Sequence, residues 1–519
     1  MGSGIQTRMA HEESQAAAGP PDDIEYGIDD RPPTGESVLL GLQHYLTMVG
    51  ANIAVPLLLV GALDMPRDAA ARFVGTFFVV SGVATLAQTT LGNRYPIVQG
   101  APFSMLAPAL AIVGVVSATG EAAWQTKLLA LQGAIITAAL AEVAIGYLGV
   151  VEKIRRYLSP VVIAPTIALI GLSLFDVPQV AGATNWWLLG FTVVLIVGFS
   201  QYLDASHRAF RLFPVLLGMV TAWAVAAVLS VAGVYTPESS GYVPLGQVAE
   251  APALLAIYPL QWGTPTVQLS LAIGMFAGVL ASIVESFGDY HAVARIAGHG
   301  APSEKRINHG IGMEGLMNVF SGIMGTGGST SYSENIGAIG LTGVASRYVV
   351  QVGAVTMIVF GYVGYFGQLV TTIPDPIVGG LFVAMFGQIV AVGLSNLAFV
   401  DLSSGRNTFV IGFALFAGLA VPAYMGNFDS AAAFRSGMER VAVLGPVLGT
   451  RLVADTLYVI GGTGMAVGGL VALVLDNTIE GTPEERGLVA WERITEEESD
   501  FRSAWERLRR DEATPESAD

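Results

Sequence analysis

The sequence contains no cysteine, so it has no disulfide framework, no thiolate metal site and no cysteine nucleophile. Histidine is scarce too, with six in 519 residues, and no group of histidines and acids has the spacing of a metal site. No serine, histidine and acidic residue form a set that suggests hydrolysis. We therefore predict a protein that is not an enzyme and that holds no metal or other cofactor.

Charged residues are also few: they make up only 13% of the chain, whereas soluble proteins carry about a quarter. No basic cluster suits nucleic acid, and no cleavable signal peptide is expected, because the first thirty residues are polar and acidic. Hydrophobic residues reach 53%, and the 63 glycines suit helices that pack closely in lipid. The composition predicts an all-α polytopic protein of the lipid bilayer.

The negative charge is concentrated in the two ends of the chain. Residues 1–36 carry −6 and residues 478–519 carry −7 of the net charge of −16. Solvated, partly disordered tails explain this charge, and so does adaptation to a high-salt cytoplasm. Within the second tail, apolar residues over 491–510 predict a short surface helix.

Apolar stretches recur along the chain at the length of membrane helices, which need about 20 residues to cross a hydrocarbon core of about 30 Å. The fourteen candidate segments are 37–60, 71–90, 103–116, 128–148, 159–175, 186–201, 211–233, 266–287, 306–324, 334–343, 348–368, 376–397, 407–425 and 453–475. The third and tenth are too short to span alone. This matching position divides the chain into seven plus seven segments, and an odd-numbered repeat must insert with inverted topology.

The predicted organisation has five parts. An acidic cytoplasmic N-terminal tail (1–36) precedes a first seven-segment repeat (37–233) and an extracellular loop (234–265). A second repeat (266–477) and an acidic cytoplasmic C-terminal tail (478–519) follow.

The basic residues agree with a cytoplasmic N-terminus. Eleven bases fall in the loops that would then be cytoplasmic, against five in the outer loops. The inner bases are Arg94, Lys153, Arg155, Arg156, Arg208, Arg211, Arg295, Lys305, Arg306, Arg347 and Arg406. Because cytoplasmic loops carry the excess of Lys and Arg, both tails are predicted to be cytoplasmic.

Ionisable side chains occur where a membrane span disfavours them. Glu285, Asp289, Glu314 and Glu334 lie in or beside the eighth to tenth segments, and His44 lies in the first. A charged residue within a span costs about 2.5–3.5 kcal/mol on insertion scales, so such residues usually have a functional role. The alternatives are helix-end carboxylates that reach water, a helix cap at Glu334 and a packing histidine at His44.

A polar, glycine-rich stretch and its counterpart in the first half lead into the two short segments. Residues 325–335 precede the tenth segment, and residues 95–104 take the matching place in the first half. Irregular backbone at membrane depth must line a protein cavity. We expect two short extended strands, each leading into a half-helix, that meet at the midplane and form a small-molecule site.

The residues at the tenth segment carry a resemblance to a known family. They read Glu334-Asn335-Ile336-Gly337-Ala338-Ile339-Gly340-Leu341-Thr342. This is similar to the signature of the nucleobase–ascorbate transporter family, also called nucleobase–cation symporter type 2. The signature has Gln, Glu or Pro first, followed by the Asn, Gly337 and Thr342, whereas Gly343 replaces the common basic residue.

Three further motifs resemble the same family in the same order. They are Leu42-Gln43-His44-Tyr45-Leu46, Glu285-Ser286-Phe287-Gly288-Asp289-Tyr290 and Leu475-Asp476-Asn477-Thr478-Ile479. The resemblance covers about 36–488. It implies fourteen segments in two inverted repeats, with segments 1–4 and 8–11 as a core domain and segments 5–7 and 12–14 as a gate domain. It also implies elevator-like transport by a homodimer in the plasma membrane.

The resemblance also assigns roles to particular positions. The implied substrate-binding residues are Glu285, Glu334, Phe103 as a stacking ring, and the backbone N–H groups near Ser333 and in the Gln99–Phe103 stretch, which includes Ala101. The residues implied in cation coupling or in support of the site are Asp289, Glu314, His44, Asn335 and Gln99. The coupling ion is H⁺ or Na⁺.

The substrate expectation rests on Glu334. Glutamate at this signature position is typical of uracil and some purine carriers, glutamine of xanthine and urate carriers, and proline of animal ascorbate carriers. The stretch 325–330 and the motif at 475–479 look closer to the eukaryotic and ascorbate-type branch. Uracil, a xanthine-type purine, and ascorbate or another small solute therefore all stay open as the substrate.

An anion carrier of the related fold is less favoured, because the site carries two carboxylates and no cation. A channel is not expected, because no ring of identical carbonyl-bearing filter loops is present.

Overall fold

The computed structural model describes residues 24–155, 157–488, 501–502 and 506. Most of both predicted tails, and most of the helix predicted over 491–510, lie outside these residues.

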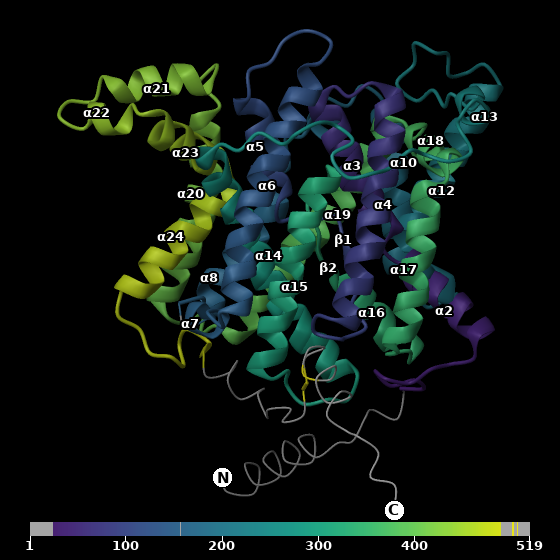
Figure 1. Cartoon of the computed structure of the whole chain (residues 1–519), viewed down its shortest axis with the longest axis horizontal. Helices are drawn as coiled ribbons and strands as arrows, with labels where there is room; N and C mark the ends of the chain where they lie inside the picture. The colour runs from purple at the N-terminus through teal and green to yellow at the C-terminus, as the bar shows by residue number, and fades with distance from the viewer. Residues whose placement is uncertain (1–23, 156, 489–500, 503–505, 507–519) are drawn as a thin grey trace, which may run out of the picture.

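Helices form most of the described chain, as the composition predicted (Figure 1). The elements before residue 250 are α2 (Thr34–Leu46), α3 (Val49–Leu63), α4 (Arg67–Thr90), β1 (Gln99–Gly100), α5 (Leu106–Val115), α6 (Ala123–Tyr147), α7 (Val151–Arg155), α8 (Pro160–Leu172), α9 (Pro178–Ala181), α10 (Trp186–Val197), the π-helix η1 (Gly198–Tyr202), α11 (Arg208–Leu212), α12 (Pro214–Val231) and α13 (Gly246–Ala249).

The second half repeats this order of elements. It comprises α14 (Leu269–Ile296), α15 (Glu304–Met324), β2 (Thr330–Ser331), α16 (Ser333–Thr342), α17 (Arg347–Tyr362), α18 (Gly364–Thr371), α19 (Asp375–Ser395), the 3₁₀-helix η2 (Asn396–Phe399), α20 (Gly405–Met425), α21 (Ala431–Glu439), α22 (Gly445–Leu448), α23 (Arg451–Gly461) and α24 (Gly464–Thr478).

Each of the fourteen predicted segments contains a helix, but helix length does not fix the number of membrane spans. Within the described ranges, six helices are long and apolar enough to cross a bilayer, and eight if two bent pairs each count as one span. Those pairs are α2 with α3, bent by 44°, and α23 with α24, bent by 95°. The count of fourteen segments therefore stays a prediction.

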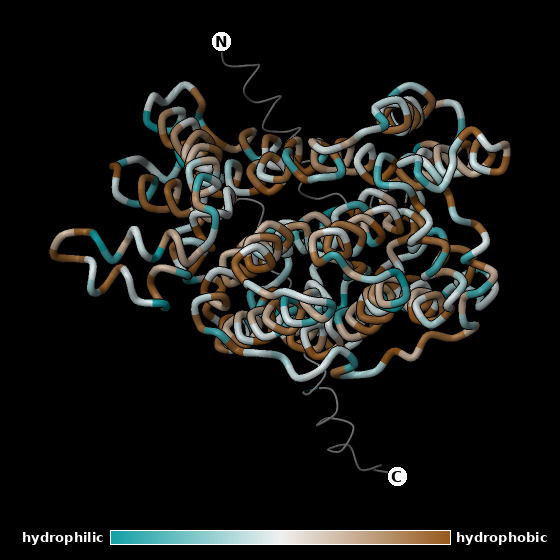
Figure 2. The backbone as a smooth tube through the Cα atoms, turned by 90° about the horizontal axis from the view of Figure 1, so that it is seen from above, coloured by the Kyte–Doolittle hydropathy of each residue, from teal (hydrophilic) through white to brown (hydrophobic). Residues whose placement is uncertain are grey.

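The helices pack in two groups, which are seen side by side from above in Figure 2. In one group α4 packs along α17 and α6 packs along α15 and α14. In the other, α8 packs on α19 and α24, α10 on α12 and α19, and α20 on α24. In the seven-plus-seven order α4 corresponds to α15 and α6 to α17, so the α4–α17 and α6–α15 contacts are equivalent under exchange of the two halves.

The only strand pair among the described residues lies between the two halves. β1 pairs antiparallel with β2, with Gln99 opposite Ser331 and Gly100 opposite Thr330. Figure 1 places both strands near the middle of the molecule, with α5 and α16 following them. The predicted arrangement of short strands leading into half-helices is confirmed.

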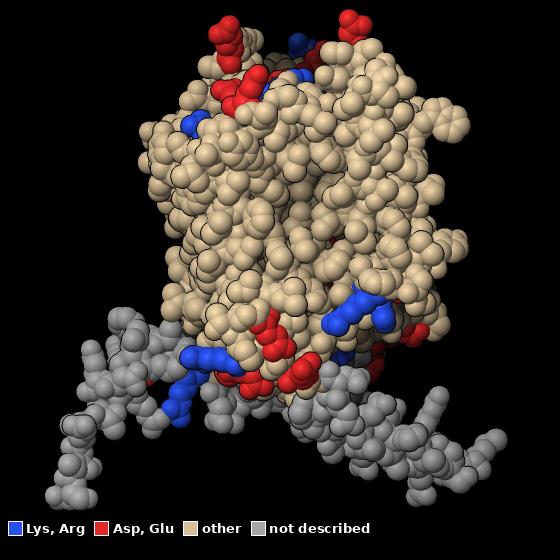
Figure 3. Space-filling view, turned by 90° about the vertical axis from the view of Figure 1, so that its right-hand side faces the viewer, with Lys and Arg blue, Asp and Glu red and all other residues tan. Residues whose placement is uncertain are grey.

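Charge is distributed as expected for a protein that crosses a bilayer. Figure 3 shows Lys, Arg, Asp and Glu gathered at the two ends of one face, whereas the surface between them is almost entirely uncharged. Large apolar side chains are exposed, among them Trp187 at 90% and Phe416 at 70%. Such exposure suits contact with lipid.

The first described residues pack against the end of the molecule where α24 also ends (Figure 1). Tyr26 forms a parallel bridge with Val344, just after α16. Asp29 pairs with Arg347, with an Oδ1–Nε distance of 2.6 Å, and with Arg94 at 3.4 Å. Residues 24–33, which we call the N-terminal strap, therefore join the loops that flank both half-helix segments.

Candidate functional site

One face of α14 carries four polar side chains at membrane depth. Ser282, Glu285, Ser286 and Asp289 lie three or four residues apart, so they point to the same side of the helix. Carboxylates on such a helix need compensating polar groups. For Asp289 these groups come from β2 and from the start of α16, whereas α15 contributes a further carboxyl group, that of Glu314.

Glu314 of α15 is buried, with 1% of its surface exposed, and it receives hydrogen bonds at both oxygens. Its Oε1 accepts from Ser282 Oγ at 2.6 Å and from Thr330 Oγ1 at 3.1 Å. Its Oε2 accepts from Ser286 Oγ at 2.5 Å and from Tyr290 Oη at 3.4 Å. Neutral hydroxyl groups, rather than a cation, therefore hold this carboxyl group in place.

Asp289 is held in the same way. Its Oδ2 accepts from Ser331 Oγ and its Oδ1 from Ser333 Oγ, both at 2.6 Å. Ser331 Oγ also lies 2.9 Å from Ser286 Oγ, which donates to Glu314. Two serine hydroxyls thus connect the carboxyl groups of Asp289 and Glu314.

Glu285 and Glu334 have different surroundings. Glu285 is half-buried, and its Oε2 has no hydrogen-bond partner in the described part of the chain. Glu334 is exposed and lies in the first turn of α16, whose N-cap Tyr332 makes no side-chain cap. The charges of the two carboxylates act on each other. Of the two predicted substrate-binding acids, Glu334 is thus an exposed acceptor, and Glu285 is a half-buried one whose unpartnered oxygen is buried. Both belong to the region of a helix N-terminus, where N–H groups lack intrahelical partners.

Phe103 lies at the boundary between the two helix groups. Only 6% of it is exposed, and its ring meets Phe386 of α19 edge-on, with centroids 6.1 Å apart. The predicted stacking ring therefore contacts the group that contains α8 and α19.

The backbone donors around β1 have acceptors within the protein. The N–H of Ala101 donates to Asn52 Oδ1 at 3.0 Å, and the N–H of Gln99 donates to Thr85 Oγ1 at 2.9 Å. The carbonyl of Ala101 accepts from Tyr332 Oη at 2.7 Å. Polar side chains from α3 and α4 accept from these two N–H groups, and their contact with a substrate stays a prediction.

The side chain of Asn335 in the second half forms hydrogen bonds with the backbone just before β1 in the first half. Its Oδ1 accepts from Val98 N–H at 2.9 Å, and its Nδ2 donates to the Pro96 carbonyl at 3.2 Å. His44 Nδ1 lies 3.4 Å from the same Nδ2. The side chain of Gln99 is buried, and neither its oxygen nor its nitrogen has a partner within the described residues.

The two remaining signature residues lie outside this polar cluster. A Cβ added to Gly337 would meet no atom within 4 Å, so no contact among the described residues requires glycine there. Thr342 Oγ1 accepts from Val344 N–H at 3.2 Å, after the α16 helix. Gly343, at the end of α16, has a φ of +71°, which favours glycine.

Sequence reasoning missed several polar residues of this region. Asn52, Asn318 and Glu142 are fully buried, each with 0% exposure. Asn318 Oδ1 accepts from Ser329 N–H at 2.6 Å, as Asn52 does from Ala101. The signal that could have found them is a single polar residue within an apolar run, which applies to Asn52 and Glu142 as it does to Glu285.

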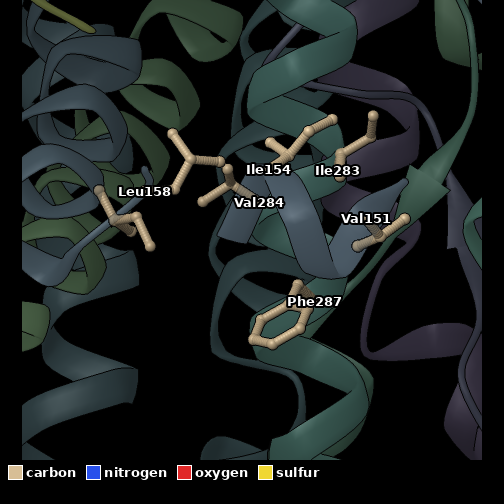
Figure 4. Close-up of a pocket in the computed structure, with 7 residues that line it drawn as sticks. Val151, Ile154, Leu158, Ile283, Val284 and Phe287 are labelled. Atoms are coloured by element: carbon tan, nitrogen blue, oxygen red, sulfur yellow. The ribbon is translucent and has the colours of Figure 1, made fainter. Parts of the chain in front are cut away.

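An apolar pocket lies close to this site along α14 (Figure 4). Its lining residues are Val151, Ile154, Leu158, Ile163, Ile283, Val284 and Phe287. Because the lining offers no hydrogen-bonding side chain, this pocket does not suit a polar solute. Among the described residues, no group of three or more histidines and acids is placed to hold a metal ion.

Comparison with known proteins identifies the family. Residues 35–426 match the model of a family described as the permease family, which comprises xanthine and uracil permeases. Solute carrier family 23 member 2 of Homo sapiens is 40% identical over 515 residues, which cover 91% of this chain and 77% of the relative. Nucleobase-ascorbate transporter 12 of Arabidopsis thaliana is 33% identical over 512 residues, covering 90% and 72%. The chain belongs to the nucleobase–ascorbate transporter family.

Solved structures of another transporter family share the fold. Murine solute carrier 26 family member A9, an anion transporter in the inward-facing state, aligns with a TM-score of 0.52 at 14% identity. The alignment covers 75% of this chain and 66% of that structure. At this identity the likeness shows the fold alone, which is the inverted-repeat fold of that structure, and the exact number of segments in this chain stays a prediction. As a member of the nucleobase–ascorbate transporter family, this chain is a multi-pass membrane transporter of a solute and not an enzyme.

Proposed function

We propose that this transporter imports a nucleobase, uracil or a xanthine-type purine, together with a cation. Glu285 on α14 and Glu334 on α16 bind the N–H groups of the base, and Phe103 stacks on its ring. Backbone N–H groups at the start of α16, near Ser333, meet its carbonyl oxygens. The coupling ion is H⁺ or Na⁺.

The observation that carries this proposal is a pair of carboxylates, Glu285 with an unpartnered oxygen among the described residues and Glu334 exposed at the start of α16. An ionised carboxylate accepts hydrogen bonds and donates none, so two of them suit a ring edge that presents N–H groups. The uncapped start of α16 supplies donors beside them. A nucleobase edge alternates N–H and C=O groups, and this arrangement of acceptors and donors is complementary to it.

The same charges disfavour an anionic solute. Ascorbate at neutral pH, sulfate and bicarbonate all carry negative charge, which Glu285 and Glu334 would repel. Among the described residues neither carboxylate forms an ion pair with a basic side chain that would offset this repulsion.

The hydroxyl-linked carboxyl groups of Asp289 and Glu314 support cation coupling. Asp289 lies four residues after Glu285 on α14, and serine and threonine hydroxyls satisfy both Asp289 and Glu314. Binding of a cation here would offset negative charge within the bundle. The charge state of this pair would then change the field at Glu285, which interacts electrostatically with both.

The two groups of helices support elevator-like movement. The polar site belongs to the group built on α4, α6, α14, α15 and α17, and its contact with the other group at Phe103 and Phe386 is apolar. An apolar contact can slide without breaking hydrogen bonds. We propose that the first group carries the substrate past the second, in a homodimer in the plasma membrane with both termini cytoplasmic.

Equilibrium binding tests the substrate directly. The purified protein in nanodiscs should bind labelled xanthine or uracil, and unlabelled ascorbate and sulfate should not displace it. Displacement by ascorbate with no competition from either base would assign the site to ascorbate instead.

A further inference from the structure

Behind the predicted site, α6 contributes a carboxyl group that no motif of the sequence indicated. Glu142 is fully buried, and its Oε2 accepts from Asn318 Nδ2 at 2.9 Å. Its Oε1 has no hydrogen-bond partner within the described residues. A buried carboxylate oxygen left without a partner is costly, so this atom points to an occupant that is not a protein side chain.

Glu142 shares its surroundings with Glu314. Glu314 and Asn318 are four residues apart on α15, so they lie on the same face of that helix, and the charges of Glu142 and Glu314 act on each other. The packing here is close, because a Cβ added to Gly315 would lie 2.6 Å from Val143 N. Two buried negative charges that act on each other across this tightly packed contact repel.

No cation among the described residues relieves this repulsion. Of the elements packed on α6, α15 contributes Glu314 and α14 contributes Tyr290, whose hydroxyl feels the charge of Glu142. The helices α3 and α5 carry no titratable side chain within their bounds. The basic residues of α15 are Lys305, Arg306 and His309, all more than one turn before Glu314, and the ring of His309 meets that of Tyr147 near the end of α6.

The geometry favours a proton over a metal ion as the occupant. Asn318 Oδ1 accepts from the N–H of Ser329, so the amide presents its NH₂ group, a donor, to Glu142. A cation such as Na⁺ needs several oxygen ligands, whereas a proton needs one. The tight α6–α15 contact at Gly315 also leaves little room for a hydrated ion.

We propose that Glu142 and Glu314 form an internal proton-binding site in which the two carboxyl groups share one proton. The proton comes from solvent, binds one carboxylate oxygen and leaves the pair with a single negative charge. The hydroxyl groups of Ser331 and Ser286 give it a route from Asp289 to Glu314. For its role in transport the inference rests on the proposed symport, and it assigns H⁺ as the coupling ion.

Infrared difference spectroscopy of the full-length protein in nanodiscs tests proton binding without any substrate. Between acid and neutral pH, the carbonyl band of a protonated, D₂O-sensitive carboxyl group should change. In Glu142→Gln this component should be lost, whereas Glu121→Gln, at an exposed turn before α6, should match the unaltered protein. A Glu142→Gln spectrum identical to that of the unaltered protein would overturn the proposal.

Two further arms keep the test decisive. If Glu142→Gln does not fold, Glu314→Gln replaces it. Because the neighbouring charge is then removed, the carbonyl band of Glu142 should titrate at lower pH. A band that titrates at the same pH as before contradicts a shared proton.

In proteoliposomes, Glu142→Gln should exchange labelled xanthine across the membrane but lose accumulation driven by a pH gradient. Unchanged accumulation would overturn the coupling role. Failure of the unaltered protein to transport any base would instead refute the proposed function and leave the spectral result valid.

Discussion

At the scale of single residues, neighbouring carboxyl groups of one helix have opposite environments. Asp289 accepts two serine hydroxyls, whereas Glu285, one turn earlier on α14, keeps one oxygen without a partner among the described residues. The difference separates a group that is already satisfied from one that is free to accept from a ligand. Their sequence spacing placed both on one face, but it did not reveal this difference, because the hydroxyl donors come from residues 331 and 333.

Glu285→Gln should weaken substrate binding strongly, because an acceptor becomes a group that also donates toward the N–H groups of the base. One mismatched buried hydrogen bond costs about 1–3 kcal/mol, which corresponds to about tenfold to more than a hundredfold in affinity. Binding of labelled xanthine and uracil to purified protein measures this. Glu304→Gln, in the exposed first turn of α15, is the control. Binding by Glu285→Gln at the unaltered affinity would remove Glu285 from the site.

Glu334→Gln should reorder substrate preferences. The start of a helix stabilises negative charge, so Glu334 is expected to act as an anionic acceptor, whereas glutamine offers one donor and one acceptor. A base that presents one N–H beside a carbonyl should gain relative to a base that presents two N–H groups. Competition among uracil, xanthine, urate and ascorbate measures the order. A uniform weakening with the order unchanged would mean that Glu334 is a structural cap.

At the scale of elements, the strand pair fixes where the two half-helices begin. The pairing of Gln99 with Ser331 and Gly100 with Thr330 depends on close contact between Gly100 and the ring of Tyr332. The sequence predicted both strands, because polar glycine-rich backbone at membrane depth needs partners inside the protein. It did not predict the hydrogen bonds from Asn52 and Asn335 to the backbone around β1, because they depend on how distant helices pack.

Gly100→Ala should destabilise the β1–β2 strand pair. A Cβ at residue 100 would lie 2.6 Å from the ring of Tyr332, and overpacking of this kind costs about 1–3 kcal/mol. Thermal unfolding of the purified protein should show a lower Tm. The control is Gly114→Ala in α5, where a Cβ would meet nothing within 4 Å. Equal Tm values for both variants would show that the strand pair tolerates a side chain.

The N-terminal strap is a second element, and its Asp29–Arg347 contact is expected to depend on pH. Burial opposes ionisation of Asp29, but the hydrogen bond and charge of Arg347, with the charges of Arg94 and Arg306, outweigh it, so the pKa of Asp29 lies below its ordinary value. A lowered pKa in the folded state means that the contact stabilises the strap at neutral pH. This stabilisation is lost as the pH falls through the lowered pKa.

Hydrogen exchange should therefore reveal a strap that loosens in acid. The N–H groups of Glu25, Ala345 and Arg347, which bond across the strap, should exchange faster below the ordinary range of aspartate titration, after correction for the intrinsic rates. In Asp29→Asn the corrected exchange should be fast already at neutral pH and should change little with acid. Equal protection of the unaltered protein at acid and neutral pH would contradict this role for Asp29.

At the scale of the whole molecule, the order of apolar segments was enough to predict two sets of seven. The matching short segments at the third and tenth places carried that inference, and the α4–α17 and α6–α15 contacts agree with it. The bends of 44° and 95° within two helix pairs were not predicted, because apolar runs continue through them. Nor did the sequence indicate Glu142 as a partner of Glu314, since that pairing exists only once α6 packs against α15.

Gradient-driven uptake is the measurement that tests the central claim most directly. Proteoliposomes that contain the purified protein are given labelled xanthine or uracil under an imposed inward gradient of H⁺ or of Na⁺. We expect one of the two bases to accumulate above its external concentration with the H⁺ gradient, and we expect the accumulation to collapse when a protonophore is added. Accumulation of ascorbate or sulfate, with no uptake of either base under either gradient, would contradict nucleobase–cation symport.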